Sequence, residues 1–198
     1  LFYEIVESGK IKCNLCPHRC IINEGEFGFC GVRKNINNKL FLMTYGKYSP
    51  ISIDPIEKKP LYHFYPGEDI LSIGGFGCNL RCNYCQNYEL SCKNAQNEDI
   101  NQYPFISVEE IVNICKDKDI KLVAYTYNEP SISFEFVLDL AKECNDNGIK
   151  FVIVSNGYIN KKPLEKLIPY LDAANIDLKF FKNKDYVKTC KGKLEPVL

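Results

Sequence analysis

Short apolar runs alternate with amphipathic helical patterns from about residue 70 to the end of the chain. The apolar runs predict buried strands at 69–75, 121–127, 149–157 and 173–180. Between and after them, apolar residues recur at spacings of three and four, which predicts helices over 107–118, 131–148, 161–171 and 183–192. The pattern therefore predicts a succession of β/α units.

Boundary signals support this reading of the pattern. Ser107 with Glu110 three residues later forms a capping-box sequence, and Gly148 stands where the second helix would end. Alternating strands and helices imply parallel strands joined by right-handed crossovers, in an open doubly wound sheet or in all or part of a barrel. In either fold, chemistry belongs at the carboxyl ends of the strands.

Polar residues follow each predicted strand at this rim. A loop with three cysteines follows the first strand, and the others are followed by Asn128 and Glu129, by Ser155 and Asn156, and by Asp177 and Lys179. A strand-end Asp or Asn commonly caps the next turn, and a lysine there can be a solvated surface charge. The occurrence of polar groups at all four strand ends favours one functional rim.

The first 68 residues differ in pattern from the rest. Cysteines occur at intervals of three, four and ten, and a proline-punctuated stretch, "SPISIDPIEKKPLYHFYPG", follows them. The cysteines are Cys13, Cys16, Cys20 and Cys30. Four thiolates suit tetrahedral zinc or an auxiliary iron–sulfur cluster. We predict a metal-binding segment with an extension over 1–68 and an α/β core over 69–198, and we expect His18 to be exposed rather than a ligand.

Charge and composition exclude several classes of partner. The chain has 198 residues, and its 25 Lys and Arg balance 25 Asp and Glu without a long basic cluster, which argues against nucleic acid or a membrane surface. No apolar run approaches a membrane span of about 20 residues, and the N-terminus lacks a signal-peptide pattern. We therefore expect a cytoplasmic protein.

The cysteine count and the chain ends support two further expectations. In a domain of this size, the cysteines favour metal over disulfides. The only methionine is Met43, and the last residues stop within the repeating pattern, so we expect a fragment truncated at its C-terminus.

The stretch "GFGCNLRCNYCQN" places Cys78, Cys82 and Cys85 within eight positions. Polar residues between the cysteines and glycines before them argue against a buried helical stripe. Structural zinc would need a fourth ligand, for which Cys92 is a candidate. A four-iron cubane normally takes four cysteines, so three would leave one iron with an open coordination position.

The segment from Cys78 to Cys85 resembles the Cys-x3-Cys-x-aromatic-Cys signature of the radical S-adenosylmethionine (SAM) superfamily. Together with "CNLCPHRC", "GFCGVR", "SIDPIEKKPLYHFYPG" and "YTYNEPSISFE", it is similar to the AmmeMemoRadiSam-system radical SAM enzymes, relatives of pyruvate formate-lyase activases. The resemblance implies a partial or full (β/α) barrel. Here it would be partial, truncated at the C-terminus, with a small cysteine-rich N-terminal segment.

The resemblance also implies the cofactors and the reaction. In that family, a 4Fe-4S cluster on three cysteines binds the amino and carboxylate groups of SAM at its open iron. Reductive cleavage of SAM then gives a 5'-deoxyadenosyl radical, which abstracts hydrogen from the substrate. An electron donor such as ferredoxin or flavodoxin would be a partner. The substrate would be either a glycine of a partner protein or a smaller molecule.

Matching positions carry the implied SAM contacts. Glu129 and Pro130 match the end of the family's Gly-Gly-Glu-Pro motif, whose acidic residue contacts the SAM amino group, while Tyr127 and Asn128 replace the two glycines. The other implied contacts are Ser155 and Asn156 near the ribose, Asp177 and Lys179 with the lysine at the SAM carboxylate, and Tyr84 on the adenine.

Two alternatives remain open from the residues alone. Tyr84 could pack in the core, and the chain could be an iron–sulfur or zinc module for electron transfer or metal binding without turnover. The remaining cysteines read as packing residues near helices and carry no predicted chemistry: Cys92, Cys115, Cys144 and Cys190.

Overall fold

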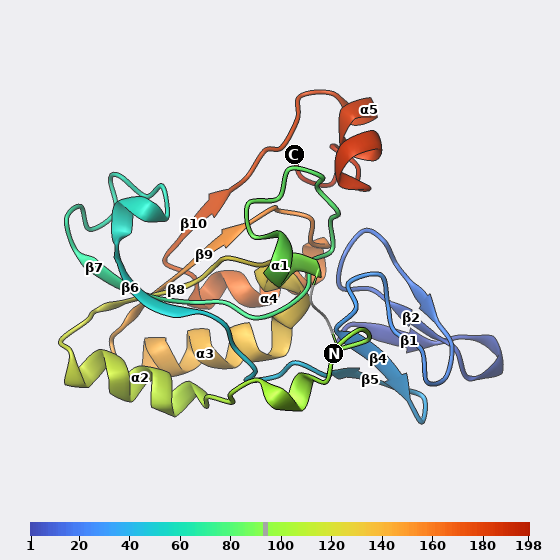
Figure 1. The fold of residues 1–198 in the computed structure, drawn as a ribbon, viewed down its shortest axis with the longest axis horizontal. Helices are drawn as coiled ribbons and strands as arrows, with labels where there is room; N and C mark the ends of the chain where they lie inside the picture. The colour runs from blue at the N-terminus through green and yellow to red at the C-terminus, as the bar shows by residue number, and fades with distance from the viewer. Residues whose placement is uncertain (93–94) are drawn as a thin grey trace.

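A computed structural model of the chain describes residues 1–92 and 95–198. Its centre is a five-stranded sheet with strand order β10-β9-β8-β7-β6 (Figure 1). The strands are β6 (Ile51–Pro55), β7 (Asp69–Ile73), β8 (Leu122–Tyr125), β9 (Lys150–Ser155) and β10 (Ala173–Ile176). β7 to β10 are parallel neighbours in chain order, as the alternating pattern predicts, and β6 is antiparallel to β7.

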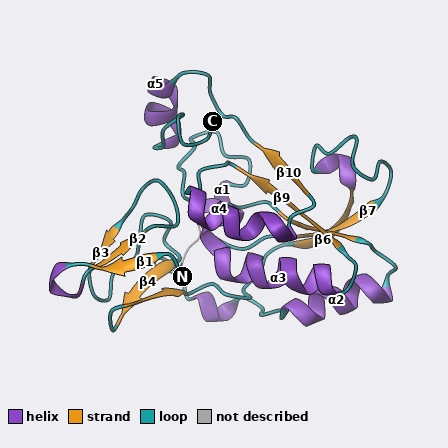
Figure 2. Cartoon of the chain, turned by 180° about the vertical axis from the view of Figure 1, so that it is seen from behind, coloured by secondary structure: helices purple, strands orange, loops and turns teal. Residues whose placement is uncertain are grey.

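Because the parallel strands succeed one another in one direction, crossovers of one hand place their helices on one face of the sheet. These helices are α2 (Val108–Asp117), α3 (Phe134–Asp146) and α4 (Lys161–Leu167), and Figures 1 and 2 show them on the same side. The predicted capping box starts α2, since the amide of Glu110 donates to Ser107 Oγ at 3.2 Å and the amide of Ser107 donates to Glu110 Oε2 at 2.7 Å.

Strand side chains alternate between two apolar layers. Ile73, Val123 and Ile153 face the helices, whereas Ile70, Leu122 and Val152 face the opposite side. That second face is covered by residues of the connection after β6, namely Ile56, Leu61 and Phe64. Burial on both faces explains why β7, β8 and β9 read as continuous apolar runs in the sequence.

The N-terminal segment forms two small antiparallel sheets beside the core (Figures 1 and 2). One contains β1 (Tyr3–Ile5), β2 (Ile11–Cys13) and β3 (Ile21–Ile22), and the other pairs β4 (Arg33–Ile36) with β5 (Lys39–Leu42). β6 lies within the predicted extension yet joins the central sheet, so the sheet begins before residue 69.

The remaining helical elements are short. The chain contains α1 (Tyr88–Cys92), α5 (Asn183–Asp185) and the π-helix η6 (Tyr186–Cys190), together with the 3-10 turns η1 (Glu7–Gly9), η2 (Ile56–Lys58), η3 (Ile100–Gln102), η4 (Pro130–Ser133) and η5 (Ile168–Tyr170). Within the described ranges, every helix is too short or too polar to span a bilayer.

Candidate active site

A cavity of about 710 Å³ lies at the carboxyl ends of β7 to β10. All the rim residues predicted from the sequence line it: Cys78, Cys82, Tyr84, Cys85, Asn128, Glu129, Ser155, Asn156, Asp177 and Lys179. Parallel strands end at one edge of a sheet, so residues up to about 100 positions apart in the chain meet there. The structure thus brings the predicted rim together.

Close backbone approaches shape the cysteine loop. A Cβ on Gly74 would lie 2.6 Å from the carbonyl oxygen of Thr126, and Gly77, at φ 79°, has no room for one beside the carbonyl of Cys30. Asn128 holds the same loop, because its Oδ1 accepts from the Gly75 amide at 2.9 Å and its Nδ2 donates to the carbonyls of Phe76 and Gly77. The polar atoms of Asn128 are therefore engaged in positioning the loop.

The three thiols of the loop are partly to largely buried around the cavity. Burial raises the pKa of Cys82 to about 12, and burial also raises that of Cys78. A buried thiolate needs a positive partner, and Lys179 acts in this direction by lowering the pKa of Cys82.

The number of thiols in the loop bears on the kind of metal group it could hold. Structural zinc takes four ligands, so the loop alone is one ligand short. A four-iron cluster gives each thiolate its own iron, so three thiolates suit such a cluster with one iron left open. Among the described residues, no group of three or more His, Cys, Asp or Glu side chains is arranged to hold a single metal ion.

Glu129 joins two strand ends at the floor of the cavity. It is 2% exposed, and its carboxylate accepts from the Ser131 amide at 2.9 Å, from Ser155 Oγ at 2.8 Å and from the Asn156 amide at 2.8 Å. Burial raises the pKa of Glu129, against the opposing effect of these hydrogen bonds. The carboxylate is thus held in place with an acceptor position to spare.

Asn79 ties the cysteine loop to its surroundings. It is fully buried, donates to the carbonyl of Tyr158 at 2.7 Å and accepts from Asn156 Nδ2 at 2.9 Å. Its own carbonyl oxygen lies 2.7 Å from His18 Nε2. The prediction that His18 is exposed is wrong, because this contact and the neighbouring ring of Phe29 half-bury it.

Lys179 and Tyr84 lie on the β10 side of the cavity. Lys179 Nζ is 2.7 Å from Asp177 Oδ2, and this partner raises the pKa of the lysine although burial alone would lower it. Tyr84 is 51% exposed, so it is not a core residue. Its hydroxyl lies 3.7 Å from Cys190 Sγ.

The sequence interpretation missed a group of three charged side chains and one tyrosine on the β6 side: Asp54, Lys58, Lys59 and Tyr127. Asp54 accepts from Lys58 Nζ at 2.9 Å, from Lys59 Nζ at 2.9 Å and from the Tyr127 hydroxyl at 2.9 Å. Burial alone would raise the pKa of Asp54, but these three donors lower it. Except for Asp54, the group lines the cavity. The two adjacent lysines in "DPIEKKP" were the sequence signal that could have indicated this group.

Tyr127 occupies a position where the related motif has glycine. Its φ is 70°, in the left-handed region that favours glycine and costs another residue about 1–2 kcal/mol. The Asp54 contact and the Lys59 ammonium, 5.0 Å from the ring centroid, hold the side chain. At this position the chain therefore has a tyrosine whose backbone adopts the left-handed conformation that glycine favours.

The four N-terminal cysteines line a second cavity of about 20 Å³, together with His18. Burial raises the pKa of Cys13 to about 11 and that of Cys16 to about 12. Asn79, which follows Cys78 in the chain, also lines this cavity, so the second cavity borders the cysteine loop.

The other cysteines have three different surroundings. Cys115 and Cys144 are buried in the main core, as predicted. Cys92 is instead partly exposed and lines a small cavity with the three loop cysteines. Cys190 is buried beside Cys82 and Tyr84, a neighbourhood that no local sequence pattern indicated.

Comparison with known proteins gives the following matches. The model of the radical SAM superfamily matches residues 72–197. An uncharacterized protein of Methanocaldococcus jannaschii is 45% identical over 100% of this chain and 58% of its own length. A protein of the same organism, provisionally named a glycyl-radical enzyme activating enzyme, is 28% identical over 63% of this chain and 46% of its own.

Two further comparisons cover smaller parts. The 4-hydroxyphenylacetate decarboxylase activating enzyme of Clostridium scatologenes is 27% identical over 56% of this chain and 36% of its own length. The crystal structure of QueE from Escherichia coli covers 58% of this chain and 54% of its own at 18% identity and a TM-score of 0.43. The chain spans 36–58% of the length of these curated relatives.

Proposed function

The chain belongs to the radical SAM superfamily, and from this premise we propose that its main cavity binds a 4Fe-4S cluster and SAM. When bound, these cofactors would supply reductive cleavage of SAM and a 5'-deoxyadenosyl radical for hydrogen abstraction. The single observation that carries the proposal is the shared cavity of the three-cysteine loop and the polar ends of three further strands.

Each lining residue has a role that its surroundings support. Cys78, Cys82 and Cys85 would hold the cluster and leave one iron without a protein ligand. The fixed carboxylate of Glu129 would accept from the SAM amino group, and Lys179 would pair with the SAM carboxylate.

The other residues predicted to bind SAM would support or flank Glu129 and Lys179. Ser155 and Asn156, which fix Glu129, border the proposed ribose position, and Asp177 orients Lys179. Asn128 would act through the backbone of the cysteine loop. The exposed ring of Tyr84 is available to pack on the adenine.

The sheet is the proposed first part of a (β/α) barrel. Its parallel strands follow one another in chain order with helices on one face, which is the arrangement of a barrel wall. Residues 69–198 would then form the radical SAM core with its four parallel strands, and residues 1–68 a metal-binding segment and extension. The segment's four cysteines would hold zinc or an auxiliary iron–sulfur cluster.

The proposed partners follow from the chemistry and the relatives. Reductive cleavage needs an electron donor, such as a ferredoxin or flavodoxin. Relatives named as activating enzymes support a protein as the substrate, as in activation of a glycyl-radical enzyme. A small molecule is the alternative substrate.

Formation of 5'-deoxyadenosine tests the proposal. Anaerobically reconstituted protein given dithionite and SAM should release it, while Cys82→Ala should not, because the loop loses a ligand of the cluster. Cys115→Ala, which removes a buried thiol of α2 in the main core, is the matched control and should retain cleavage. Absence of product from fully loaded wild-type protein, or its release by Cys82→Ala, would contradict the proposal.

A further inference from the structure

The charged side chains of the main cavity are unevenly paired. At the β10 side, Lys179 is matched by Asp177, and at the floor Glu129 is satisfied by three donors. At the β6 side, the ammonium groups of Lys58 and Lys59 share the single carboxylate of Asp54. Glu57, on the same turn, is not among the lining residues and accepts from the Gly67 amide instead. Among the lining lysines of that wall and their partner, two positive charges therefore face one negative charge, an excess of one positive charge.

The two lysines differ in what they can still contact. Lys59 is 3% exposed and fixed between Asp54 and the ring of Tyr127, so it serves as a buried support. The side chain of Lys58 is 66% exposed, and its ammonium group has two donor positions beyond its bond to Asp54. Lys58 is therefore the group that can meet a ligand in the cavity.

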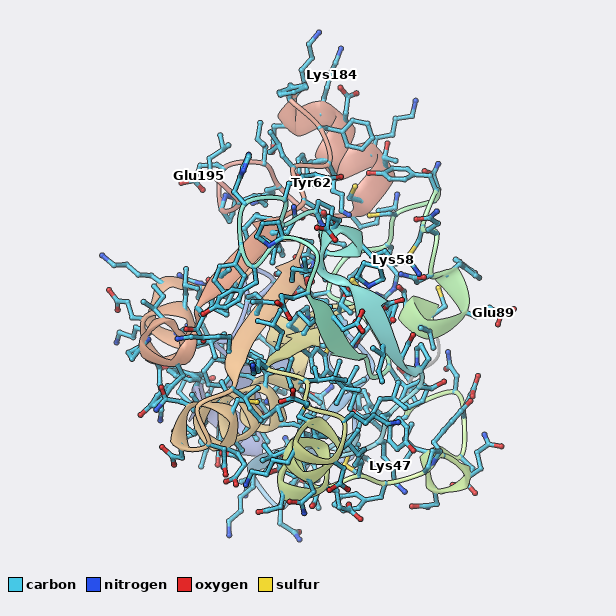
Figure 3. The ribbon with its side chains drawn as sticks, turned by 90° about the vertical axis from the view of Figure 1, so that its left-hand side faces the viewer. Lys47, Lys58, Tyr62, Glu89, Lys184 and Glu195 are labelled. Carbon is cyan, nitrogen blue, oxygen red and sulfur yellow. The ribbon has the colours of Figure 1, made fainter. Side chains whose placement is uncertain are left out.

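In the sheet, the wall lies far from Lys179, the proposed partner of the SAM carboxylate. β6 and β10 are the two edge strands, separated by four strand spacings, or about 19 Å along the sheet. Figure 3 shows Lys58 over the strands, between the loop that carries Tyr62 and helix α1 with Glu89. A ligand group at Lys58 is thus distinct from one held by Lys179.

We propose that Lys58, supported by Asp54 and Lys59, binds a carboxylate of the substrate. This inference rests on the proposed function, because it assigns the substrate class for the same cavity. The excess of one positive charge matches a carboxylate, whereas a phosphate monoester carries about −1.5 to −2 at neutral pH. Charge-assisted bonds to an ammonium in a partly enclosed cavity supply the recognition.

Propionate and propionamide test the site, because they have the same shape and differ in charge. Ligand-observed NMR titration should show at least about tenfold tighter binding of propionate, the value of one charge-assisted bond. Lys58→Gln should lose that preference, and Lys58→Arg should keep it. Lys184 is in α5, far from Lys58 in Figure 3, and does not line the cavity, so Lys184→Gln should match wild type. The Lys59–Asp54 pair does not involve Lys58, so the Lys58 variants should fold as the wild type does.

Retention of the propionate preference in Lys58→Gln would overturn the assignment, as would tighter binding of inorganic phosphate than of propionate. SAM affinity of the cluster-loaded enzyme should be unchanged in Lys58→Gln, and a tenfold loss would assign the lysine to SAM instead. The peptide acetyl-Gly-Asp-Gly-amide presents the carboxylate on a chain. The site is supported whether the peptide or propionate binds more tightly, and tighter binding of the peptide would indicate a protein substrate. Because these titrations need no turnover, they can refute the carboxylate site without bearing on SAM cleavage, and the cleavage assay can fail without bearing on this site.

Discussion

Replacement of Glu135 by alanine should leave the guanidinium of Arg33 buried without its counter-charge. Arg33 is 2% exposed on β4, and its Nη1 and Nη2 donate to Glu135 Oε1 at 3.2 Å and Oε2 at 2.5 Å. Its Nε donates to the carbonyl of Ile132 at 3.0 Å. The Arg33–Glu135 pair joins the N-terminal segment to α3, which begins five residues after Glu129.

The magnitude follows from the two bonds to Arg33 that are lost, because the ion pair of Glu135 with the half-exposed Leu1 ammonium, at 3.5 Å, contributes little. Each charge-assisted hydrogen bond contributes about 1.5–3 kcal/mol, and breaking a buried pair costs about 3–5 kcal/mol. The Glu135 side chain is 22% exposed, so water can reach part of the vacated space, and the lower end, about 3 kcal/mol, applies. Arg33→Met should cost less, about 1–2 kcal/mol, because the carboxylate it leaves behind is closer to solvent.

Anaerobic urea unfolding followed by circular dichroism measures these differences. The double variant Arg33→Met with Glu135→Ala should be more stable than Glu135→Ala alone, since it removes the unpaired buried charge. A smaller loss for Glu135→Ala than for Arg33→Met would refute the reasoning.

The same pair gives a pH dependence. Burial alone would raise the pKa of Glu135, but Arg33 lowers it below the usual value. The carboxylate therefore stabilises the fold above its unfolded pKa of about 4.3, and this contribution is lost as the pH falls through the folded pKa. The gap between wild type and Glu135→Ala should accordingly narrow below about pH 4.

Three further substitutions probe the cavity. Cys82→Ala should remove iron from the central loop and leave the metal that we propose at the N-terminal cysteines, as measured by metal content per chain; loss of both would contradict two separate sites. Lys179→Ala should weaken SAM binding more than cluster assembly, and unchanged SAM affinity would remove the lysine from the pocket. Tyr127→Phe should destabilise the fold by about 1.5 kcal/mol through the lost bond to Asp54, and an unchanged urea midpoint would show that this bond contributes nothing.

Local patterns predicted the elements and the rim for physical reasons. β7, β8 and β9 are buried on both faces, so their apolar runs stand out, and the capping box of α2 is a contact between near neighbours. Once the strands are known to be parallel, topology alone brings Glu129 and Lys179 to one edge.

Contacts between distant segments left no such signal. β6 contains a proline and pairs only as an edge strand, so it read as an irregular extension. The meeting of Cys190 with Tyr84 spans 106 positions, and that of Arg33 with Glu135 spans 102. The burial of His18 likewise depends on Asn79, a residue that the sequence presented only as a polar spacer.

The electron paramagnetic resonance spectrum of the reduced protein, recorded with and without SAM, tests the central claim most directly. A cluster held by Cys78, Cys82 and Cys85 would have an iron open to SAM, whereas an electron-carrier cluster would have four protein ligands. The account predicts that SAM changes the spectrum of the wild-type protein, with no such signal at the central site of Cys82→Ala. A cluster spectrum that SAM leaves unchanged would contradict it and favour a module for electron transfer.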